Sequence, residues 1–134
     1  METPFIKTAE SIALLAHGEL YFDHSKRVAL KDKNESEIVL GYLHDVIEDS
    51  ELFDYDILSK IYKIPDSILT SLHAITRDKN KETYFDYIKR LSTDELARQV
   101  KIYDLEDHLY YKEAIPASLI QRYEKALCFL QNKI

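Results

Sequence analysis

The stretch ESEIVLGYLHDVIED, residues 35–49, decides how this chain folds. Apolar side chains recur in it at intervals of three and four residues, which is the spacing of one face of an α-helix. The residues on that face are Ile38, Val39, Tyr42, Leu43, Val46 and Ile47. We therefore expect one amphipathic helix over 35–49, with this face packed on the core.

Helical patterns also precede this stretch. The spacing predicts a helix over 3–17, with Thr3 as its cap and Gly18 as its end, because glycine commonly terminates helices. A short helix over 22–31 and a polar break at 31–34 follow. The break separates this first part of the chain from the helix over 35–49.

Further helical patterns follow the stretch, and no segment alternates apolar and polar residues for long, as a half-buried strand does. Ser92 and Glu95 resemble a capping box that opens one of these helices. The expected helices run over about 54–62, 66–76, 83–91, 93–110 and 116–131. The chain is thus predicted to be all-α, a single domain over 1–134 of about seven to eight helices.

The composition excludes several classes of protein. Among 134 residues the single cysteine, Cys128, has no partner for an internal disulfide, which excludes a disulfide-stabilised scaffold and favours a reducing compartment. No run approaches the ~18 apolar residues of a membrane span, and the start lacks the pattern of a signal peptide. We expect a cytoplasmic protein with no membrane contact, and an inert Cys128 in its core.

Glycine usage and charge exclude two further functions. The chain has only 2 glycines, Gly18 and Gly41, whereas Rossmann and P-loop phosphate sites need clustered glycines. The net charge is −6, and the segment between Lys33 and Lys60 contains eight acidic residues and no Lys or Arg. A nucleic-acid-binding protein has a basic stripe instead. We therefore expect no nucleic-acid partner.

The most informative part of the acidic segment is HDVIED, residues 44–49. On a helix His44 and Glu48 share a face, as do Asp45 and Asp49, because residues four apart lie one turn apart. An imidazole nitrogen beside carboxylate oxygens suits a divalent ion such as Mn²⁺, Fe²⁺ or Zn²⁺. A solvated acidic face with a chance histidine explains the same pattern about as well.

A second acidic pattern lies in VKIYDLEDH, residues 100–108. Asp104 stands among apolar residues in the interior of a predicted helix, where Asp is unfavourable. Its presence there is easier to explain if a positive charge compensates it. The alternative is an exposed helix face, because Glu106 and Asp107 are expected to be exposed.

Several segments together resemble the HD-domain metal-dependent phosphohydrolases, and in particular the RelA/SpoT hydrolase domains and small stand-alone alarmone hydrolases. The segments GYLHDVIEDS (41–50), YFDHSKRVA (21–29) and VKIYDL (100–105) resemble family motifs in the family's order. The segments AITR (74–77), YFDYI (84–88) and RYEKA (122–126) resemble further stretches of the single-domain members. The resemblance covers about residues 17–127 and implies an HD-type helical bundle.

The resemblance also implies a site. Its metal ligands are His24, His44, Asp45 and Asp104, with Mn²⁺ the most expected ion; His17 is a weaker candidate, because the Tyr-x-x-His context favours His24. Glu48 and Asp49 are expected to orient and deprotonate the attacking water. The expected substrate contacts are Arg77, Lys79, His108 and Tyr123. For Lys79 a solvated loop position is the alternative, and for Tyr123 the edge of the core.

The resemblance is incomplete before His24. Alarmone hydrolases place a loop with an Arg-Lys pair there, which embraces the nucleobase, whereas here residues 18–20 run directly into Tyr21. The expected reaction is release of pyrophosphate from the 3′ position of a (p)ppGpp-like or (p)ppApp-like nucleotide. Two alternatives stay open: an HD-superfamily nucleotidase or phosphodiesterase acting on another nucleotide, and a non-catalytic helical module that binds a nucleotide or a protein.

Overall fold

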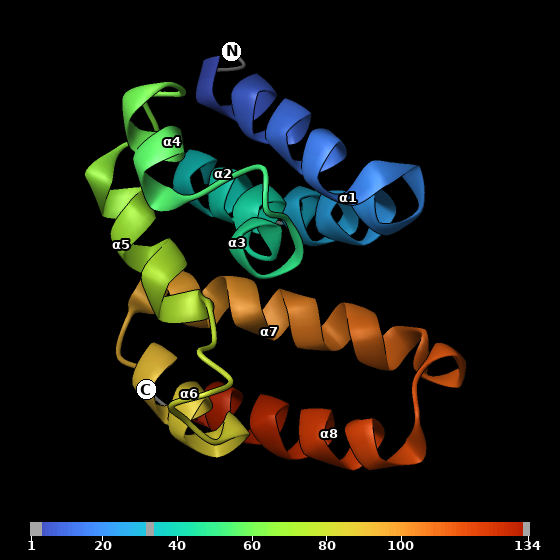
Figure 1. The fold of residues 1–134 in the computed structure, drawn as a ribbon. Helices are drawn as coiled ribbons and strands as arrows, with labels where there is room; N and C mark the ends of the chain where they lie inside the picture. Colours follow the sequence, from blue (N-terminus) through green and yellow to red (C-terminus); the bar gives the residue numbers. More distant parts are fainter. Residues whose placement is uncertain (1–3, 32–33, 133–134) are drawn as a thin grey trace.

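The structure is a computed structural model that describes residues 4–31 and 34–132. Those residues form eight α-helices and one short 3-10 helix, with no strand among them, so the all-α prediction is confirmed (Figure 1). The helices are α1 (Pro4–Leu30), α2 (Glu35–Leu43), α3 (Val46–Asp49), α4 (Tyr55–Lys60), α5 (Asp66–Ile75), α6 (Tyr84–Leu91), α7 (Glu95–Tyr110), η1 (Lys112–Ala114) and α8 (Ala117–Asn132). None of these helices has the length and apolar character needed to span a membrane.

Helix α1 consists of two helical segments that meet at Gly18. The backbone of Gly18 has φ 74° and ψ 173°, a conformation that is accessible almost only to glycine. The chain changes direction there and continues as a helix to Leu30, as the expected end at Gly18 and new helix at 22 suggested. The predicted cap Thr3, and residues 32–33 of the predicted break, lie outside the described residues.

The single helix predicted over 35–49 is wrong in one respect, because it breaks at His44 and Asp45. Helix α2 ends at Leu43 and α3 begins at Val46. The ring nitrogen Nδ1 of His44 lies 2.6 Å from the carbonyl oxygen of Gly41. In a continuing helix this oxygen would accept the backbone N–H of Asp45. His44 and Asp45 therefore project from a turn between two helices.

The predicted start of α7 is also wrong. Ser92 ends α6 and donates its hydroxyl to the carbonyl of Lys89 at 2.7 Å, so it does not cap α7. The cap is Asp94, whose carboxylate accepts the N–H of Ala97 at 2.8 Å. Aspartate caps helices as well as serine does. The observed cap therefore lies two residues after the predicted one.

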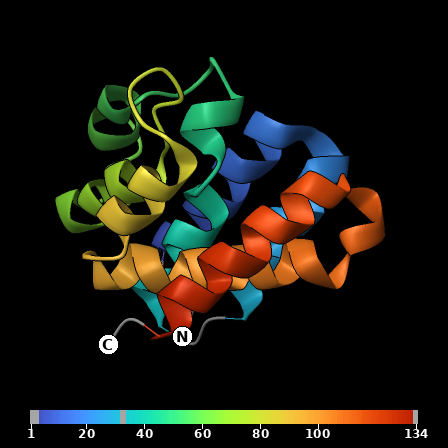
Figure 2. The ribbon, with the colours of Figure 1, turned by 90° about the horizontal axis from the view of Figure 1, so that it is seen from below.

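Helix α7 lies at the centre of the molecule. It contacts α1, α2 and α5 on one side and α8 on the other. Figure 1 shows α7 running between the first three helices and α8, which returns beneath it, and Figure 2 shows α8 lying across α7 from below. A residue in the middle of α7 is therefore surrounded by segments from most of the chain.

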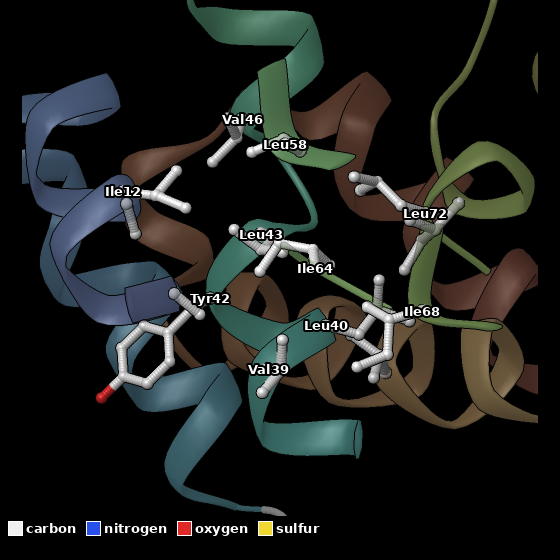
Figure 3. Close-up of a cluster of buried hydrophobic side chains, with 14 of the residues drawn as sticks. Ile12, Val39, Leu40, Tyr42, Leu43, Val46, Leu58, Ile64, Ile68 and Leu72 are labelled. Carbon is white, nitrogen blue, oxygen red and sulfur yellow. The ribbon is translucent and has the colours of Figure 1, made fainter. Parts of the chain in front are cut away.

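Two apolar clusters build the core, and α7 contributes to both. The larger cluster includes the apolar face of α2 with residues of α1, α4 and α5, and Figure 3 shows these side chains converging. The smaller one joins α6, α7 and α8. Val100 belongs to the first cluster and Leu105 to the second, so Asp104 lies where the two meet. Cys128, expected in the core, is instead exposed.

Candidate metal centre

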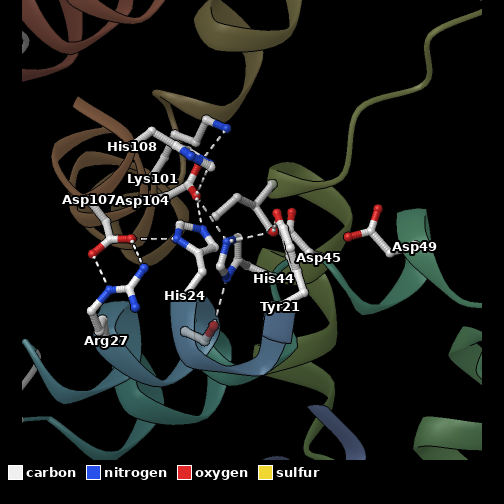
Figure 4. A network of polar contacts seen from close by, with 12 residues as sticks. Tyr21, His24, Arg27, His44, Asp45, Asp49, Lys101, Asp104, Asp107 and His108 are labelled. Atoms are coloured by element: carbon white, nitrogen blue, oxygen red, sulfur yellow. Dashed lines mark hydrogen bonds and ion pairs between the residues drawn. The ribbon is translucent and has the colours of Figure 1, made fainter. Parts of the chain in front are cut away.

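Four side chains from distant parts of the sequence converge at the junction of α1, the α2–α3 turn and α7. His24 comes from the second half of α1, His44 and Asp45 from the turn, and Asp104 from the middle of α7 (Figure 4). One ligand atom from each lies within 4.8 Å of all the others. These are the four metal ligands that the sequence motifs implied, and the structure brings all of them together.

Asp104 is the centre of this cluster. Its Oδ1 lies 2.8 Å from Nε2 of His24 and 3.1 Å from Nε2 of His44, while its Oδ2 accepts from Lys101 Nζ at 2.9 Å. Burial alone would raise the pKa of Asp104, but the charge of Lys101 and the histidines hold that pKa well below its usual value. Lys101 is thus the compensating charge that an aspartate in this position requires.

Both histidines are oriented by the nitrogen that faces away from the cluster. Nδ1 of His44 contacts the Gly41 carbonyl, which can only accept, so Nδ1 carries a proton. Nδ1 of His24 lies 2.7 Å from Oδ2 of Asp107. The Nε2 atoms of both rings consequently face Asp104. A proton and a divalent cation would compete for these Nε2 positions.

The aspartate beside His44 is held from two sides. Oδ2 of Asp45 lies 3.1 Å from Nε2 of His44 and accepts the hydroxyl of Tyr21 at 2.9 Å. Burial alone would lower the pKa of His44, but the charge of Asp45 helps to raise this pKa well above its usual value. Tyr21 therefore fixes the direction of one carboxylate of the cluster.

The donor set fits a divalent metal ion. Ligands at about 2.1 Å from a metal lie at most about 4.2 Å from one another, and the four atoms here already lie within 4.8 Å. Two imidazole nitrogens and two carboxylate oxygens suit Mn²⁺, Fe²⁺ or Zn²⁺. Four protein ligands would leave positions open on an ion that takes six.

A cavity of about 320 Å³ opens beside the cluster. Four carboxylates line one part of it, and Leu119 with basic and aromatic side chains lines the rest; the carboxylates are those of Asp45, Glu48, Asp49 and Asp104. The basic residues are Arg77, Lys79, Lys101 and Arg122. The aromatic rings are those of Tyr21, Tyr84, Tyr87, His108 and Tyr123. The cavity therefore brings two of the candidate metal ligands and several basic side chains to the same volume, which suits an anion that a metal also binds.

Glu48 and Asp49, the proposed proton acceptors, both line this cavity from α3. Glu48 accepts the backbone N–H of Arg77 at 2.9 Å, which ties α3 to the loop after α5. Partial removal from water raises the pKa of Glu48. The same effect, with the charges of Asp45 and Glu48, raises the pKa of Asp49 to about 6. Carboxylates with raised pKa values are suited to accept a proton near neutral pH.

The four predicted substrate contacts, Arg77, Lys79, His108 and Tyr123, all line the same cavity. The ring of His108 stacks between those of His24 and Tyr123, at centroid distances of 4.3 and 5.3 Å. The guanidinium of Arg77 lies over the ring of Tyr84, and its Nε has no hydrogen-bond partner among the described residues. Lys79 is exposed at the rim.

His17, the weaker candidate for the metal, lies outside the cluster of four. Its side chain is buried, and its Nδ1 is 3.7 Å from Oδ2 of Asp49. It therefore neighbours a proposed proton acceptor rather than the ligand atoms.

Some residues of the site were not found from the sequence. Lys101 stands three residues before Asp104 on one helix, so this pair could have been predicted from spacing alone. Asp107 was expected to be exposed, but only 4% of it is accessible, because Arg27 of α1 covers it. Tyr21 and Arg122 stand in motifs that were recognised, but no role in the site was assigned to them, since what they contact depends on how α1 and α8 pack.

Comparisons with protein-family models and with curated protein sequences find no match to this chain.

Proposed function

We propose that this chain is a metal-dependent phosphohydrolase of the HD type, which removes pyrophosphate from the 3′ position of a (p)ppGpp-like or (p)ppApp-like nucleotide. One observation supports this most strongly. Two of the four candidate ligands, Asp45 and Asp104, line one cavity of about 320 Å³ together with two carboxylates of raised pKa and four basic side chains. The other two ligands, His24 and His44, contact Asp104 from outside the cavity lining. Metal-dependent hydrolysis of a phosphate ester uses a metal site, a proton acceptor and cations for the phosphate oxygens close together.

In this proposal His24, His44, Asp45 and Asp104 hold the metal. When bound, such an ion lowers the pKa of water and offsets charge on phosphate oxygens. The protein contributes orientation: the Gly41 carbonyl and Asp107 direct the two rings, and Lys101 balances the charge of Asp104.

The two carboxylates of α3 have the role of proton acceptor. Glu48 is fixed by the backbone N–H of Arg77, and Asp49 lies beside it at the same wall of the cavity. Either carboxylate can take the proton that water loses as it attacks phosphorus. The P–O bond to the 3′ oxygen breaks in the same displacement. The carboxylate can then return the proton to that oxygen, so that the nucleotide leaves with a 3′ hydroxyl and the pyrophosphate keeps the oxygen of water.

The basic residues suit a substrate with more than one phosphate. Arg77 and Arg122 can contact phosphate oxygens in pairs, whereas Lys79 acts as a point charge at the rim. A single phosphate at the metal would not require so many cations. A pyrophosphate provides a second anionic group next to the reacting one, which matches this arrangement.

One observation favours the rival substrate class, a different nucleotide hydrolysed by the same site. The chain passes from the kink at Gly18 directly to Tyr21, whose hydroxyl contacts Asp45. No Arg-Lys loop that embraces a base precedes His24 in this sequence. The base is therefore the least constrained part of the proposed substrate.

The test combines metal analysis with a substrate screen. Purified protein is analysed for Mn²⁺, Fe²⁺ and Zn²⁺, stripped, reloaded and assayed on 3′-pyrophosphorylated nucleotides, other nucleotides and generic phosphoesters. We expect turnover that depends on the metal and is highest on the first group. Preference for another nucleotide would assign the rival substrate class, and a protein that binds metal without turnover would indicate a non-catalytic module.

Variants assign the roles of individual residues in the same assay. His44→Ala and Asp45→Ala should lose both metal and turnover, because each removes a ligand. Glu48→Gln should retain the metal but lose turnover, while Glu51→Gln, which changes an acid outside the cavity lining, should leave both intact. Turnover at the wild-type rate in Glu48→Gln would exclude Glu48 as the proton acceptor.

A further inference from the structure

Asp107 lies behind the candidate metal centre and touches neither its cavity nor its four ligand atoms. It stands three residues after Asp104 on α7, so the two carboxylates share one face of the helix. Only 4% of Asp107 is accessible, and its Oδ2 lies 2.7 Å from Nδ1 of His24. Asp107 therefore contacts the side of the His24 ring that points away from the centre (Figure 4).

A second residue holds Asp107 in place. Arg27 donates from Nε to Oδ1 at 2.8 Å and from Nη2 to Oδ2 at 3.0 Å, which is the paired geometry of a guanidinium and a carboxylate. Arg27 is three residues after His24 on α1, and its guanidinium lies 4.6 Å from the ring centre of Tyr111. The contacts join α1 to α7 at this point.

The two histidines of the centre use different acceptors for the same purpose. A carbonyl fixes His44, whereas a carboxylate fixes His24. A carboxylate that accepts from Nδ1–H keeps the proton on that nitrogen and leaves the Nε2 lone pair free to bind a cation. Because Arg27 already donates to both oxygens, the carboxylate cannot rotate away from the ring.

We propose that Asp107, clamped by Arg27, is a positioning residue for His24: it selects the tautomer protonated at Nδ1 and aims Nε2 at a divalent cation. The inference rests on the proposed metal site, since it concerns how that site is prepared. It extends the site by two residues that contact neither substrate nor metal.

Binding of Mn²⁺ alone tests the inference without any assay of activity. Titration calorimetry compares the wild type with Asp107→Asn, which keeps the size of the side chain but places an NH₂ group against Arg27 or His24. We expect Mn²⁺ affinity to fall by about 10–100-fold. Glu106→Gln, the neutralisation of the neighbouring acid on the same helix, is the matched control and should bind as the wild type does.

A spectroscopic measurement separates positioning from a general loss of structure. Long-range ¹H–¹⁵N spectra of the imidazoles, recorded on Zn²⁺-loaded protein, in which the cation replaces the proton at Nε2, report which ring nitrogen carries the remaining proton. His24 should be protonated at Nδ1 in the wild type and should lose this preference in Asp107→Asn, while His44 should be unchanged. If Asp107→Asn fails to fold, Arg27→Gln, which leaves the carboxylate in place, should still weaken Mn²⁺ binding several-fold.

The outcomes distinguish this inference from the proposed function. A wild-type protein that binds no Mn²⁺ overturns the metal site and the positioning role with it. If the wild type binds Mn²⁺ and Asp107→Asn binds it equally well with an unchanged His24 tautomer, only the positioning role is overturned.

Discussion

Asp49 is the residue whose protonation should be easiest to follow. Its pKa is raised to about 6 by partial burial and by the charges of Asp45 and Glu48. In metal-free protein, carboxyl-detected NMR should therefore show Asp49 titrating near pH 6, well above the ~3.9 of a free aspartate. Adding Zn²⁺ should lower this pKa, because a nearby cation favours the ionised carboxylate.

The variant Glu48→Gln is a control for this titration, because it removes one of the two neighbouring negative charges and should lower the pKa of Asp49. A midpoint near pH 4 in the wild type would contradict the structure.

The pH dependence of stability follows from the same shift in the pKa of Asp49. Between about pH 4 and 6 the folded state binds more protons at Asp49 than the unfolded state does, so this group's contribution to the free energy of unfolding falls as pH rises.

Single residues also show what sequence motifs can and cannot reveal. His24, His44, Asp45 and Asp104 could be named from motifs, and the structure places their ligand atoms within 4.8 Å of one another. Asp107 was expected to be exposed and is buried. The difference arises because nothing in the local sequence around Asp107 indicates a guanidinium located 80 residues earlier in the chain.

At the scale of elements, the break between α2 and α3 shows that apolar periodicity does not fix where a helix ends. The apolar spacing continues through 35–49, yet the helix stops at Leu43 and restarts at Val46. The contact of the His44 ring with the Gly41 carbonyl, at 2.6 Å, depends on a local side-chain conformation that apolar spacing does not encode. The break turns His44 and Asp45 towards Asp104.

Helices α1 and α2 pack closely enough to require glycine at position 41. A Cβ at Gly41 would lie 2.7 Å from the Cα of Ala29 and 3.0 Å from its backbone nitrogen, so relief would require the helices to move apart. We expect Gly41→Ala to lower the free energy of unfolding by about 1–2 kcal/mol, since overpacking costs ~1–3 kcal/mol and the gain in helix propensity returns up to ~1 kcal/mol. Urea unfolding measures this.

Gly18→Ala is an informative comparison, because a Cβ there meets nothing within 4 Å and only the backbone conformation, with φ +74°, is strained. The two variants should therefore differ in Mn²⁺ binding. The carbonyl of Gly41 orients His44, so we expect Gly41→Ala to displace this carbonyl and weaken Mn²⁺ binding, and Gly18→Ala to leave it in place. A stable Gly41→Ala protein with unchanged unfolding would contradict the close approach of α1 and α2.

At the scale of the whole molecule, the proposed ligands join three separate parts of the chain around α7. A metal bound there would link α1, the α2–α3 turn and α7, and the four ligand atoms come together only in the folded state. At a free metal concentration of 100 times the Kd, the stabilisation is about 2.7 kcal/mol. For a domain of this size we expect Mn²⁺ to raise the melting temperature by roughly 10 °C.

The quantity to compare between proteins is the change in melting temperature when metal is added. The melting temperatures themselves are not comparable, because His44→Ala also changes the stability of the metal-free protein. That variant should show almost no shift with Mn²⁺, while Glu51→Gln should shift as the wild type does. Equal shifts in all three proteins would mean that the metal binds elsewhere.

The sequence by itself determined the class of fold. Apolar spacing of three and four residues, scarce glycine and proline, and the absence of alternating segments are local properties, so they predicted the helices to within a few residues even where their caps were wrong. Motifs likewise named the candidate ligands. Only the tertiary structure decided that these side chains meet, that Arg27 balances the buried Asp107, and that α3 faces the loop after α5. The contacts of His24 with Asp104 and of Arg27 with Asp107 join residues 80 positions apart. They form only when α7 is packed against α1, and no local pattern specifies that packing.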